Sequence, residues 1–363
     1  MVHFQHAEGR AVLRRAVPLD EVGAPRFSHL ECKFPFRLLA PVQAANDATV
    51  NAAKYVDTAD RSAPIKSVGI LFTLGFGGGL ISGDRVNLEI DVGEHTRLLM
   101  LTQGNTNVYR VRRGGDPVAS IMRAQGPNEI SRQHTRYHVR KNATLVLLPA
   151  PVTCFARSRY AQTQRFDLHC GASSSLILLD WFTSGRVAVN KTDCRIPELW
   201  HFYMYHSRNE VRVNGDVIVR DRQHLAQDLP DQLQEDTTTD LAQRCEPYTC
   251  FGIVILYGIE CEALCRSLSE EYDQIQQPQP LLRSGGTLGS SRVSPPEVLW
   301  SLSPLCSGAP VPGGNMKTGS RVDKGLILRV AGTETDAVRA WLYKHLLPVK
   351  YLIGDDMYRI ALG

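Results

Sequence analysis

Two histidines four residues apart, His134 and His138, have the spacing that most directly suggests a metal site. On a helix or on a strand, this spacing places both imidazoles on the same face, where they could share one metal ion. No glutamate follows the first histidine, so the pair is not the HExxH motif of zinc proteases. The alternative is a pair of surface histidines near arginines, and the residues alone favour that alternative.

Nine cysteines are scattered through the chain without a regular spacing. An odd number at irregular intervals is not a disulfide framework, and it fits the reducing cytoplasm. The pairs Cys245/Cys250 and Cys261/Cys265 could supply thiolates to zinc, but their spacing is loose for a zinc site. We predict that most of these thiols pack as small apolar side chains.

A cluster of glycines at residues 75–79 could cradle a phosphate. In the GxGxxG pattern counted from Gly75, however, the sixth position is Leu80, and no phosphate-binding GxxxxGK motif occurs in the chain. Tight β-turns explain the cluster better. The chain is therefore predicted neither to bind nor to hydrolyse GTP.

Residues 180–186 (DWFTSGR) place a serine beside a glycine at the end of an apolar run. The nucleophile motif GxSxG is absent, and no histidine is evidently paired with Ser184. No pair of carboxylates stands out for acid–base catalysis. We therefore predict that the protein is not an enzyme.

Strands dominate the elements that must position these residues. Apolar and polar residues alternate at 86–92, which is typical of a strand with one buried face. Residues 175–181 are largely apolar and too short for a typical helix, which indicates a strand buried on both faces. Asn214-Gly215 between valines predicts a type I′ hairpin. Further strands are predicted at 9–17, 65–73, 97–102, 117–124, 130–139, 144–148, 159–168, 251–257 and 326–330, and residues 25–40 hold another apolar stretch.

Helical spacing occurs mainly late in the chain. Residues 261–275 fit one helix, and residues 335–347 fit another with Thr335 as N-cap. Residues 221–246 also show leucines at helical spacing, beginning at Leu225. The predicted stripe of the helix at 335–347 consists of Ala337, Ala340, Trp341 and His345.

Composition excludes several classes of partner. The formal net charge is +4, and no basic block interleaved with aromatic residues points to nucleic acid. The N-terminal segment lacks the apolar core of a secretory signal, and no window approaches the ~20 apolar residues of a membrane helix. We expect a cytoplasmic protein that binds neither nucleic acid nor a membrane.

Four sequence blocks together resemble the urease accessory proteins called UreD (UreH in some bacteria). The blocks are residues 78–85 (GGLISGDR), 101–110 (LTQGNTNVYR), 178–186 (LLDWFTSGR) and 198–202 (ELWHF). The resemblance covers residues 10–225 well and residues 326–347 weakly. It predicts a single UreD-like domain over residues 1–363, with flexible insertions at 41–63 and 277–320. The insertions suggest a eukaryotic, fungal-like member.

The resemblance implies a scaffold rather than a catalyst. Family members act in nickel delivery to apo-urease: UreD binds UreF, which recruits the nickel-carrying GTPase UreG, and UreD contacts urease itself. The implied fold is mainly β, a helical, layered stack of strands similar to a β-solenoid, with two or three α-helices mostly toward the C-terminus. A water-filled tunnel is the nickel route proposed for the family. The sequence leaves open whether the chain dimerises within that complex.

A nickel route needs exchangeable ligands, so nickel would be held transiently and not tightly. Carboxylates of the matched blocks are the predicted ligands: Asp84, Glu198 and Asp180. For each carboxylate the alternative is a β-turn cap or an ion pair with Arg85 or Arg186. The other residues of the signature are Gly78, Gly79, Gly83, Gln103, Tyr109, Trp181, Thr183, Ser184, Gly185, Arg186 and Trp200.

Two other classes of function stay open. A nickel- or zinc-binding storage or sensor protein, with no urease partner, would use His134, His138 and the cysteines and would bind metal tightly. A β-solenoid enzyme acting on polysaccharide would need a cleft with paired acids, for which the sequence offers no convincing spacing.

Overall fold

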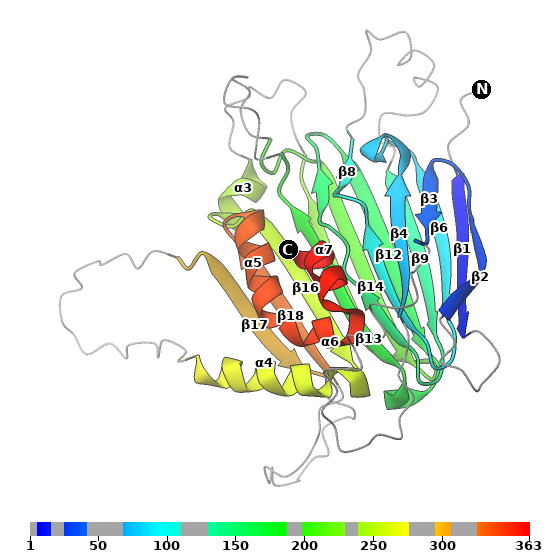
Figure 1. Cartoon of the computed structure of the whole chain (residues 1–363). Helices are drawn as coiled ribbons and strands as arrows, with labels where there is room; N and C mark the ends of the chain where they lie inside the picture. Colours follow the sequence, from blue (N-terminus) through cyan, green and yellow to red (C-terminus); the bar gives the residue numbers. More distant parts are fainter. Residues whose placement is uncertain are drawn as a thin grey trace.

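Two β-sheets lie face to face, and the chain passes from one to the other repeatedly (Figure 1). This computed structural model describes residues 6–15, 25–41, 68–109, 130–186, 198–228, 239–275, 295–305 and 325–363. Within these residues, one sheet has seven strands and the other has eleven.

The seven-stranded sheet has the order β15-β14-β12-β9-β6-β1-β2. Its strands are β1 (His6–Arg15), β2 (Pro25–Cys32), β6 (Arg85–Val92), β9 (Ser131–Val139), β12 (Arg159–Leu168), β14 (Met204–Val213) and β15 (Asp216–Ala226).

The eleven-stranded sheet has the main order β17-β18-β16-β13-β10-β7-β4-β3, to which three short strands attach at one edge. The main strands are β3 (Phe36–Leu39), β4 (Val68–Gly75), β7 (Arg97–Thr102), β10 (Thr144–Leu147), β13 (Ser175–Thr183), β16 (Cys250–Tyr257), β17 (Val298–Pro304) and β18 (Gly325–Gly332). The short strands are β5 (Gly79–Leu80), β8 (Thr106–Val108) and β11 (Val152–Cys154).

Between β6 and β14 the chain winds as a regular coil. β6, β9, β12 and β14 are parallel neighbours in the seven-stranded sheet. β7, β10 and β13 come between them in sequence and are parallel neighbours in the other sheet. Each turn of the coil therefore adds one strand to each sheet, and antiparallel strands complete the sheets at both ends. This arrangement confirms the predicted mainly β, layered stack.

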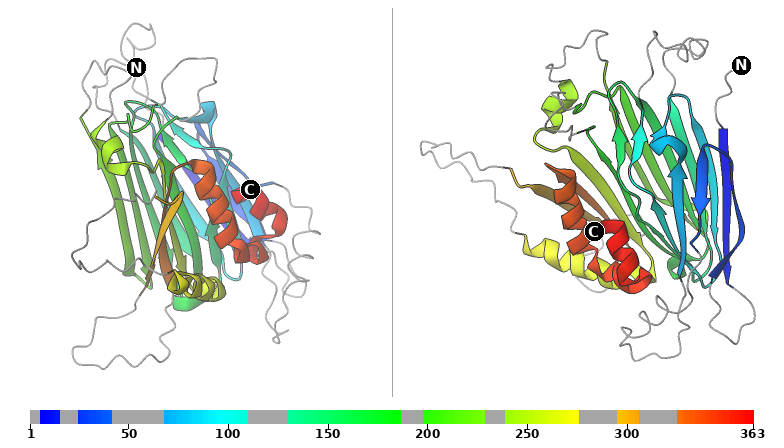
Figure 2. Two further views of the ribbon diagram at one scale, coloured as in Figure 1. Left: turned by 90° about the vertical axis from the view of Figure 1, so that its left-hand side faces the viewer. Right: turned by 45° about the horizontal axis from the view of Figure 1, so that its top comes forward.

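Most of the described helices lie over the outer face of the eleven-stranded sheet (Figures 1 and 2). The described helices are α3 (Asp240–Cys245), α4 (Glu262–Gln274), α5 (Thr335–His345), α6 (Lys350–Ile353) and α7 (Asp355–Leu362), with 3-10 turns η1 (Phe76–Gly78), η2 (Gly171–Ser173), η3 (Ile259–Cys261) and η4 (Leu347–Val349). The sequence predicted α4 and α5; α6 and α7 follow them without having been predicted. Among the described helices, none has the length and apolar character needed to cross a membrane.

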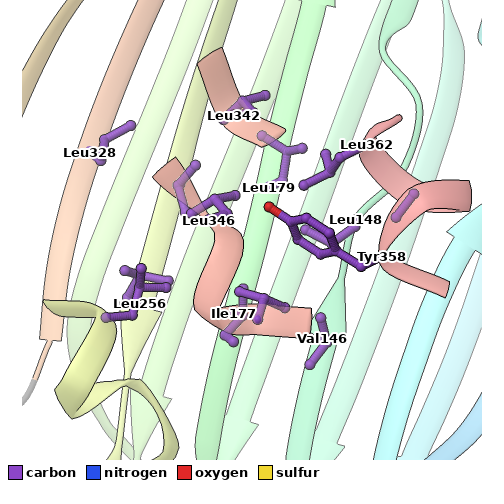
Figure 3. Close-up of a cluster of buried hydrophobic side chains, with 14 of the residues drawn as sticks. Val146, Leu148, Ile177, Leu179, Leu256, Leu328, Leu342, Leu346, Tyr358 and Leu362 are labelled. Carbon is purple, nitrogen blue, oxygen red and sulfur yellow. The ribbon is translucent and has the colours of Figure 1, made fainter. Parts of the chain in front are cut away.

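One apolar cluster holds α5, η4, α6 and α7 against the sheet (Figure 3). Leu179 of β13 lies near Leu342 of α5 in this cluster, Ile177 lies farther along the same strand, and all three side chains are fully buried. Tyr358 of α7 is also buried there, and its hydroxyl donates a hydrogen bond of 2.6 Å to the backbone oxygen of Tyr343. The C-terminal helices are therefore part of the core.

The structure corrects the predicted details of α5. Glu334 is the N-cap residue without a side-chain cap bond, and Thr335 is the first helical residue. The fully buried positions are Val338 and Leu342, because that face lies on the sheet. Of the predicted stripe, Ala337 is half-buried, Ala340 is exposed, and Trp341 and His345 stack on each other at the edge of the cluster.

The helical prediction at residues 221–246 is also wrong at its start. β15 continues through Leu225 to Ala226, paired with β14, because the hairpin at Asn214-Gly215 keeps the two strands in register. The helix α3 begins only at Asp240, and the hydroxyl of its N-cap Thr239 accepts a hydrogen bond of 3.1 Å from the Ala242 amide.

Part of one predicted insertion has regular structure. Within 277–320, β17 pairs with β18 at the edge of the eleven-stranded sheet. The rest of that range beyond residues 295–305, the range 41–63 apart from residue 41, and the predicted strand at 117–124 lie outside the described residues.

Candidate functional site

The residue blocks found in the sequence meet at one edge of the eleven-stranded sheet. β4, β7, β10 and β13 are parallel, so their carboxyl ends lie together. The loops that follow them are residues 76–78, 103–105, 148–151 and 184–186. We call these loops, with the short strands β5, β8 and β11 between them, the signature edge. The edge is therefore assembled from segments up to about a hundred residues apart in sequence.

Two glycines allow the segments of this edge to approach closely. A Cβ atom on Gly79 would lie 2.0 Å from the backbone oxygen of Asn107, which pairs with it across β5 and β8. A Cβ atom on Gly185 would lie 2.1 Å from the backbone oxygen of Glu198. Any other residue at either position would push the backbones apart. Close packing of the backbone therefore explains both glycines without a bound phosphate.

Side chains brace the glycine turn η1 from the next loop. The Tyr109 hydroxyl donates a hydrogen bond of 3.0 Å to the backbone oxygen of Gly77. The Asn107 side-chain amide donates one of 3.0 Å to the backbone oxygen of Gly78. Both glycines have a positive φ, which residues with a side chain rarely adopt. The glycine backbone and the two side-chain hydrogen bonds together fix the conformation of the turn.

A row of rings and charges continues from this turn along the signature edge. The Tyr109 ring packs edge-on against Phe155 with centroids 5.2 Å apart, and the Arg186 guanidinium lies 4.6 Å above the Phe155 ring. Arg186 in turn forms an ion pair with Glu198. Four separate blocks of sequence thus contribute to one continuous surface.

Two exposed phenylalanines lie beside this row. Phe76 of η1 is 50% exposed and Phe34 is 61% exposed, and their ring centroids are 5.3 Å apart. The Phe76 amide donates a 2.8 Å hydrogen bond to the backbone oxygen of Pro35, which fixes the two loops to each other. An exposed aromatic pair on fixed backbone is typical of protein–protein contact surfaces.

The remaining signature residues support the edge from within. The Trp181 indole donates a 2.7 Å hydrogen bond to the backbone oxygen of Pro149, and the Thr183 hydroxyl donates one of 3.1 Å to Thr153. Trp200 is buried against Phe182. Three further members take part through the backbone: Ser184 bonds to Thr249, Gln103 bonds to Thr73, and Gly83 has a positive φ.

Two of the three predicted nickel ligands have local partners. The Asp84 carboxylate accepts a 2.9 Å hydrogen bond from the Ile81 amide and so closes its own turn, and burial raises the pKa of this carboxyl. Glu198 pairs with Arg186 and accepts a 3.2 Å hydrogen bond from the Ala156 amide. Asp84 therefore has the geometry of a turn cap and Glu198 that of an ion-pair partner, which are the alternatives to nickel ligation given above.

Asp180 is different, because it lies inside the sandwich and is only 3% exposed. Its carboxylate accepts hydrogen bonds from the Ser207 hydroxyl at 2.6 Å, from the Asn209 amide at 2.7 Å and from the Gln162 amide at 3.2 Å. Burial raises the pKa of this carboxyl, and the three hydrogen bonds oppose that shift. The bonds join the eleven-stranded sheet to the seven-stranded one across the interior.

These partners belong to a polar layer that crosses the sandwich. In the seven-stranded sheet, one row of directly paired, inward-facing residues is Gln133, Gln162, Ser207 and Gln223. The next row is Thr135, Gln164, Asn209 and Asp221. On β12, Tyr160 belongs to one apolar cluster and Phe166 to another, with the two glutamines between them. We call the two rows and Asp180 the polar layer.

The polar layer opens into a cleft at the β15 side of the sandwich. The cleft has a volume of about 560 Å³ and is lined by Asp221 and Gln223 together with apolar residues such as Phe251 and Val330. Arg329 forms a 3.0 Å ion pair with Asp221 Oδ1. Within the described part of the chain, Asp221 Oδ2 and Gln223 Oε1 are buried without a hydrogen-bond partner. Two acceptor oxygens thus remain free at the inner end of the cleft.

His134 and His138 cannot share a metal ion. Both lie on the outer face of β9, but four residues of an extended strand span roughly 13 Å. The metal-sharing interpretation did not allow for the length of a strand, whereas the favoured alternative, a surface histidine near arginines, describes the exposed His134. His138 instead meets His169, with the nitrogens Nδ1 and Nε2 3.3 Å apart.

Of the four paired cysteines, Cys250, Cys261 and Cys265 are buried, and Cys245 is half-buried. Cys261 is buried and donates weak hydrogen bonds to the backbone oxygens of Leu176 and Tyr257. Burial raises the pKa of Cys250 to about 12, so its thiol stays protonated. Across the described residues, no group of three or more His, Cys, Asp or Glu side chains is arranged to hold a metal ion.

Sequence reasoning missed the amides and hydroxyls of the polar layer. Gln162, Gln164, Ser207 and Asn209 occur in strands whose outward residues are also polar, so the sequence shows no contrast between faces. The available signal is a period of two: Gln162 and Gln164 lie between Tyr160 and Phe166, and Ser207 and Asn209 lie between Tyr205 and Val211. This signal acquires meaning only when the sheet register is known.

Comparison with known proteins agrees with these blocks. The family model described as UreD urease accessory protein matches residues 7–356. Urease accessory protein 4 of Cryptococcus neoformans var. grubii is 28% identical over 342 residues, which cover 92% of this chain and 90% of the relative. Urease accessory protein D of Arabidopsis thaliana is 27% identical over 350 residues, 94% of this chain and 98% of the relative. Urease accessory protein UreD of Anaeromyxobacter sp. is 29% identical over 282 residues, 78% and 73% of the two chains.

Proposed function

The chain belongs to the UreD family of urease accessory proteins, and from this premise we propose that it is a scaffold for nickel insertion into apo-urease. In this proposal it docks UreF-type and UreG-type accessory proteins onto urease. The family match over residues 7–356 carries the proposal. Relatives named urease accessory proteins occur in fungi, plants and bacteria. A scaffold requires protein-binding surfaces and no catalytic group.

The signature edge is the surface that we assign to a protein partner of this complex. Phe76 is exposed there with Phe34 beside it, and aromatic side chains that become buried on binding contribute strongly to protein interfaces. The bracing by Tyr109 and Asn107 supports the assignment, because a preformed surface loses little conformational entropy on binding. Arg186 adds a cation at the rim, although Glu198 already pairs with it.

For nickel, the polar layer is the route that we propose through the protein. Asp221 and Gln223 offer unpaired oxygens at the cleft, and they pair across β14 and β15 with Asn209 and Ser207, which bind Asp180. Oxygen ligands suit a hard or borderline cation that must move on. Burial raises the pKa of the Asp180 carboxyl, so protons compete more strongly with a cation for this ligand, which supports transient binding.

Co-purification tests the scaffold. The chain is expressed with UreF-type and UreG-type proteins and apo-urease from a related organism, and the retained proteins are quantified. We expect Phe76→Asp to reduce retention of one partner at least tenfold, since it places a charge in the contact. Ile259→Asp is the matched control, because Ile259 is 58% exposed at the opposite end of the sheet. If the unaltered chain retains none of the three partners, the proposed function is wrong.

Nickel transfer is tested separately with limiting nickel. The variant Gln162→Leu with Asn209→Leu replaces two polar-layer amides by apolar groups, and it should lower the nickel content of urease while partner retention stays unchanged. The variant Asp84→Ala with Glu198→Ala tests the two other predicted ligands. Full nickel loading by every variant would remove the proposed route and leave the scaffold in place.

A further inference from the structure

We propose that His138 and His169 form a binding site for one divalent transition-metal ion, such as Zn²⁺ or Ni²⁺, on the outer face of the seven-stranded sheet. The site lies outside the signature edge and outside the polar layer. It does not depend on the proposed function, because it is argued from the geometry and the surroundings of the two imidazoles.

The distance between the two nitrogens fits two ligands of one ion. His138 Nδ1 and His169 Nε2 are 3.3 Å apart. Two metal–nitrogen bonds of about 2.0–2.1 Å enclosing that distance make an N–metal–N angle of roughly 105–110°, which is close to tetrahedral. The rings are nearly parallel, at an interplanar angle of 22°. Water would complete the coordination, because no third protein ligand is in place.

The fold positions these histidines from two different strands. His138 is on β9, and His169 directly follows β12, the parallel neighbour of β9. The His169 amide donates a 2.9 Å hydrogen bond to the backbone oxygen of Val139, which fixes the second histidine beside the first. The His138 side chain is 13% exposed, whereas His169 is exposed, so an ion could reach the pair from solvent.

Carboxylates surround the pair on the side of His138. Glu89 Oε1 lies 3.6 Å from His138 Nε2, the nitrogen that faces away from His169. A carboxylate behind a metal-binding imidazole orients the ring and raises its basicity. Asp167 Oδ2 lies 4.0 Å from His138 Nδ1. The same oxygen accepts a hydrogen bond from Arg136, so the Asp167 carboxylate offsets the positive charge of that guanidinium.

The protonation state also supports a metal ligand. Burial lowers the pKa of both His138 and His169, with nearby arginines contributing. Both imidazoles are therefore neutral at neutral pH and keep a lone pair for a cation.

A second histidine pair on the same face provides an internal contrast. His206 and His224 lie directly opposite each other on β14 and β15, with ring centroids 5.4 Å apart. The ionic groups that act on His206 are Arg222 and Arg208, which are both cations. Arg208 and Arg222 form the next outward-facing pair along the same two strands, and two guanidiniums beside the histidines repel a metal ion, so we expect no binding at this pair.

Equilibrium dialysis of the full chain against Zn²⁺ and against Ni²⁺ tests the site. We expect His138→Gln and His169→Ala each to lose one equivalent of bound metal relative to the unaltered chain. Because His169 is exposed, its replacement leaves the fold intact, and circular dichroism checks this for every variant. Glu89→Gln should keep the equivalent but bind it roughly tenfold more weakly.

The controls are His134→Ala on the same strand and His224→Ala in the second pair, and both should bind as the unaltered chain does. Unchanged metal binding by folded His138→Gln and His169→Ala would overturn the proposal. The absence of any bound metal in the unaltered chain would overturn it as well, and the two imidazoles would then share only a hydrogen bond.

Discussion

The two outer faces of the sandwich are built from different chemistry. The outer face of the eleven-stranded sheet is apolar and is covered by α4 to α7 through residues such as Leu99, Val146 and Ile177 (Figure 3). The outer face of the seven-stranded sheet carries charged residues, and none of these four helices lies over it (Figure 2). The first face is held by burial of apolar surface and the second by ion pairs.

This difference predicts which substitutions matter. An apolar contact under a helix loses both transfer free energy and packing when it is truncated. An ion pair whose arginine stays in contact with water contributes much less. The polar layer lies between the two sheets and has buried hydrogen bonds. Substitutions in it should therefore reduce stability by an amount between those expected for the two outer faces.

Leu342→Ala in α5 should have the largest effect. The side chain is fully buried between the helix and β13, so its truncation should lower the free energy of unfolding by about 2–5 kcal/mol. Denaturant unfolding measures this value. The exposed Ala340 on the same helix gives the control, since Ala340→Ser should change stability little. Equal effects at both positions would contradict the packing of α5 on the sheet.

Asp180→Asn should come second. The amide presents two donors to groups that are themselves donors, namely Ser207, Asn209 and Gln162. We expect a loss of about 1–3 kcal/mol in the free energy of unfolding. Asp216→Asn on the exposed hairpin is the control. A more stable Asp180→Asn variant would mean that the three hydrogen bonds are not formed.

Asp91→Asn should have a smaller effect that depends on pH. Asp91 is largely buried, yet hydrogen bonds from Arg140 and Arg14 outweigh that burial and lower its pKa to about 2. At neutral pH the variant should lose roughly 1–2 kcal/mol, between the values for exposed and buried pairs.

The sign of the pH dependence follows from the lowered pKa of Asp91. The stabilisation is complete above the ordinary pKa of about 3.9 and is lost as the pH falls through about 2. The stability difference between the unaltered chain and Asp91→Asn should therefore shrink between about pH 5 and pH 2. A constant difference over that range would exclude the ion pairs as its source.

Arg132→Gln should have the smallest effect. Arg132 on β9 lies directly opposite Arg85 on β6, and like charges in such pairs repel. The substitution should leave the free energy of unfolding within about 0.5 kcal/mol or raise it slightly. A thermal unfolding series at low salt checks this. A large loss of stability would show that Arg132 has a structural partner.

The sequence predicted individual strands and turns more accurately than it predicted which strands and side chains lie beside each other. Alternation at 86–92 and the apolar run at 175–181 correctly predicted β6 with one buried face and β13 with two. Asn214 and Gly215 both have positive φ, which confirms the predicted hairpin. These features depend on local periodicity and turn chemistry, which the sequence carries directly.

The candidate site was less accessible to sequence reasoning. The signature blocks could be recognised, but their convergence depends on the parallel register of β4, β7, β10 and β13. The contact of His138 with His169 depends on the pairing of β9 with β12, whereas the sequence suggested His134 as its partner. Long-range register is set by tertiary packing, so no local pattern contains it.

Urease activation tests the central proposal most directly. Apo-urease is mixed with UreF-type and UreG-type proteins, GTP and limiting nickel, with or without this chain, and both urease activity and bound nickel are measured. We predict strong activation only when the chain is present, and loss of that activation with Phe76→Asp but not with Ile259→Asp. Equal activation with and without the chain would contradict a role for this protein in nickel insertion.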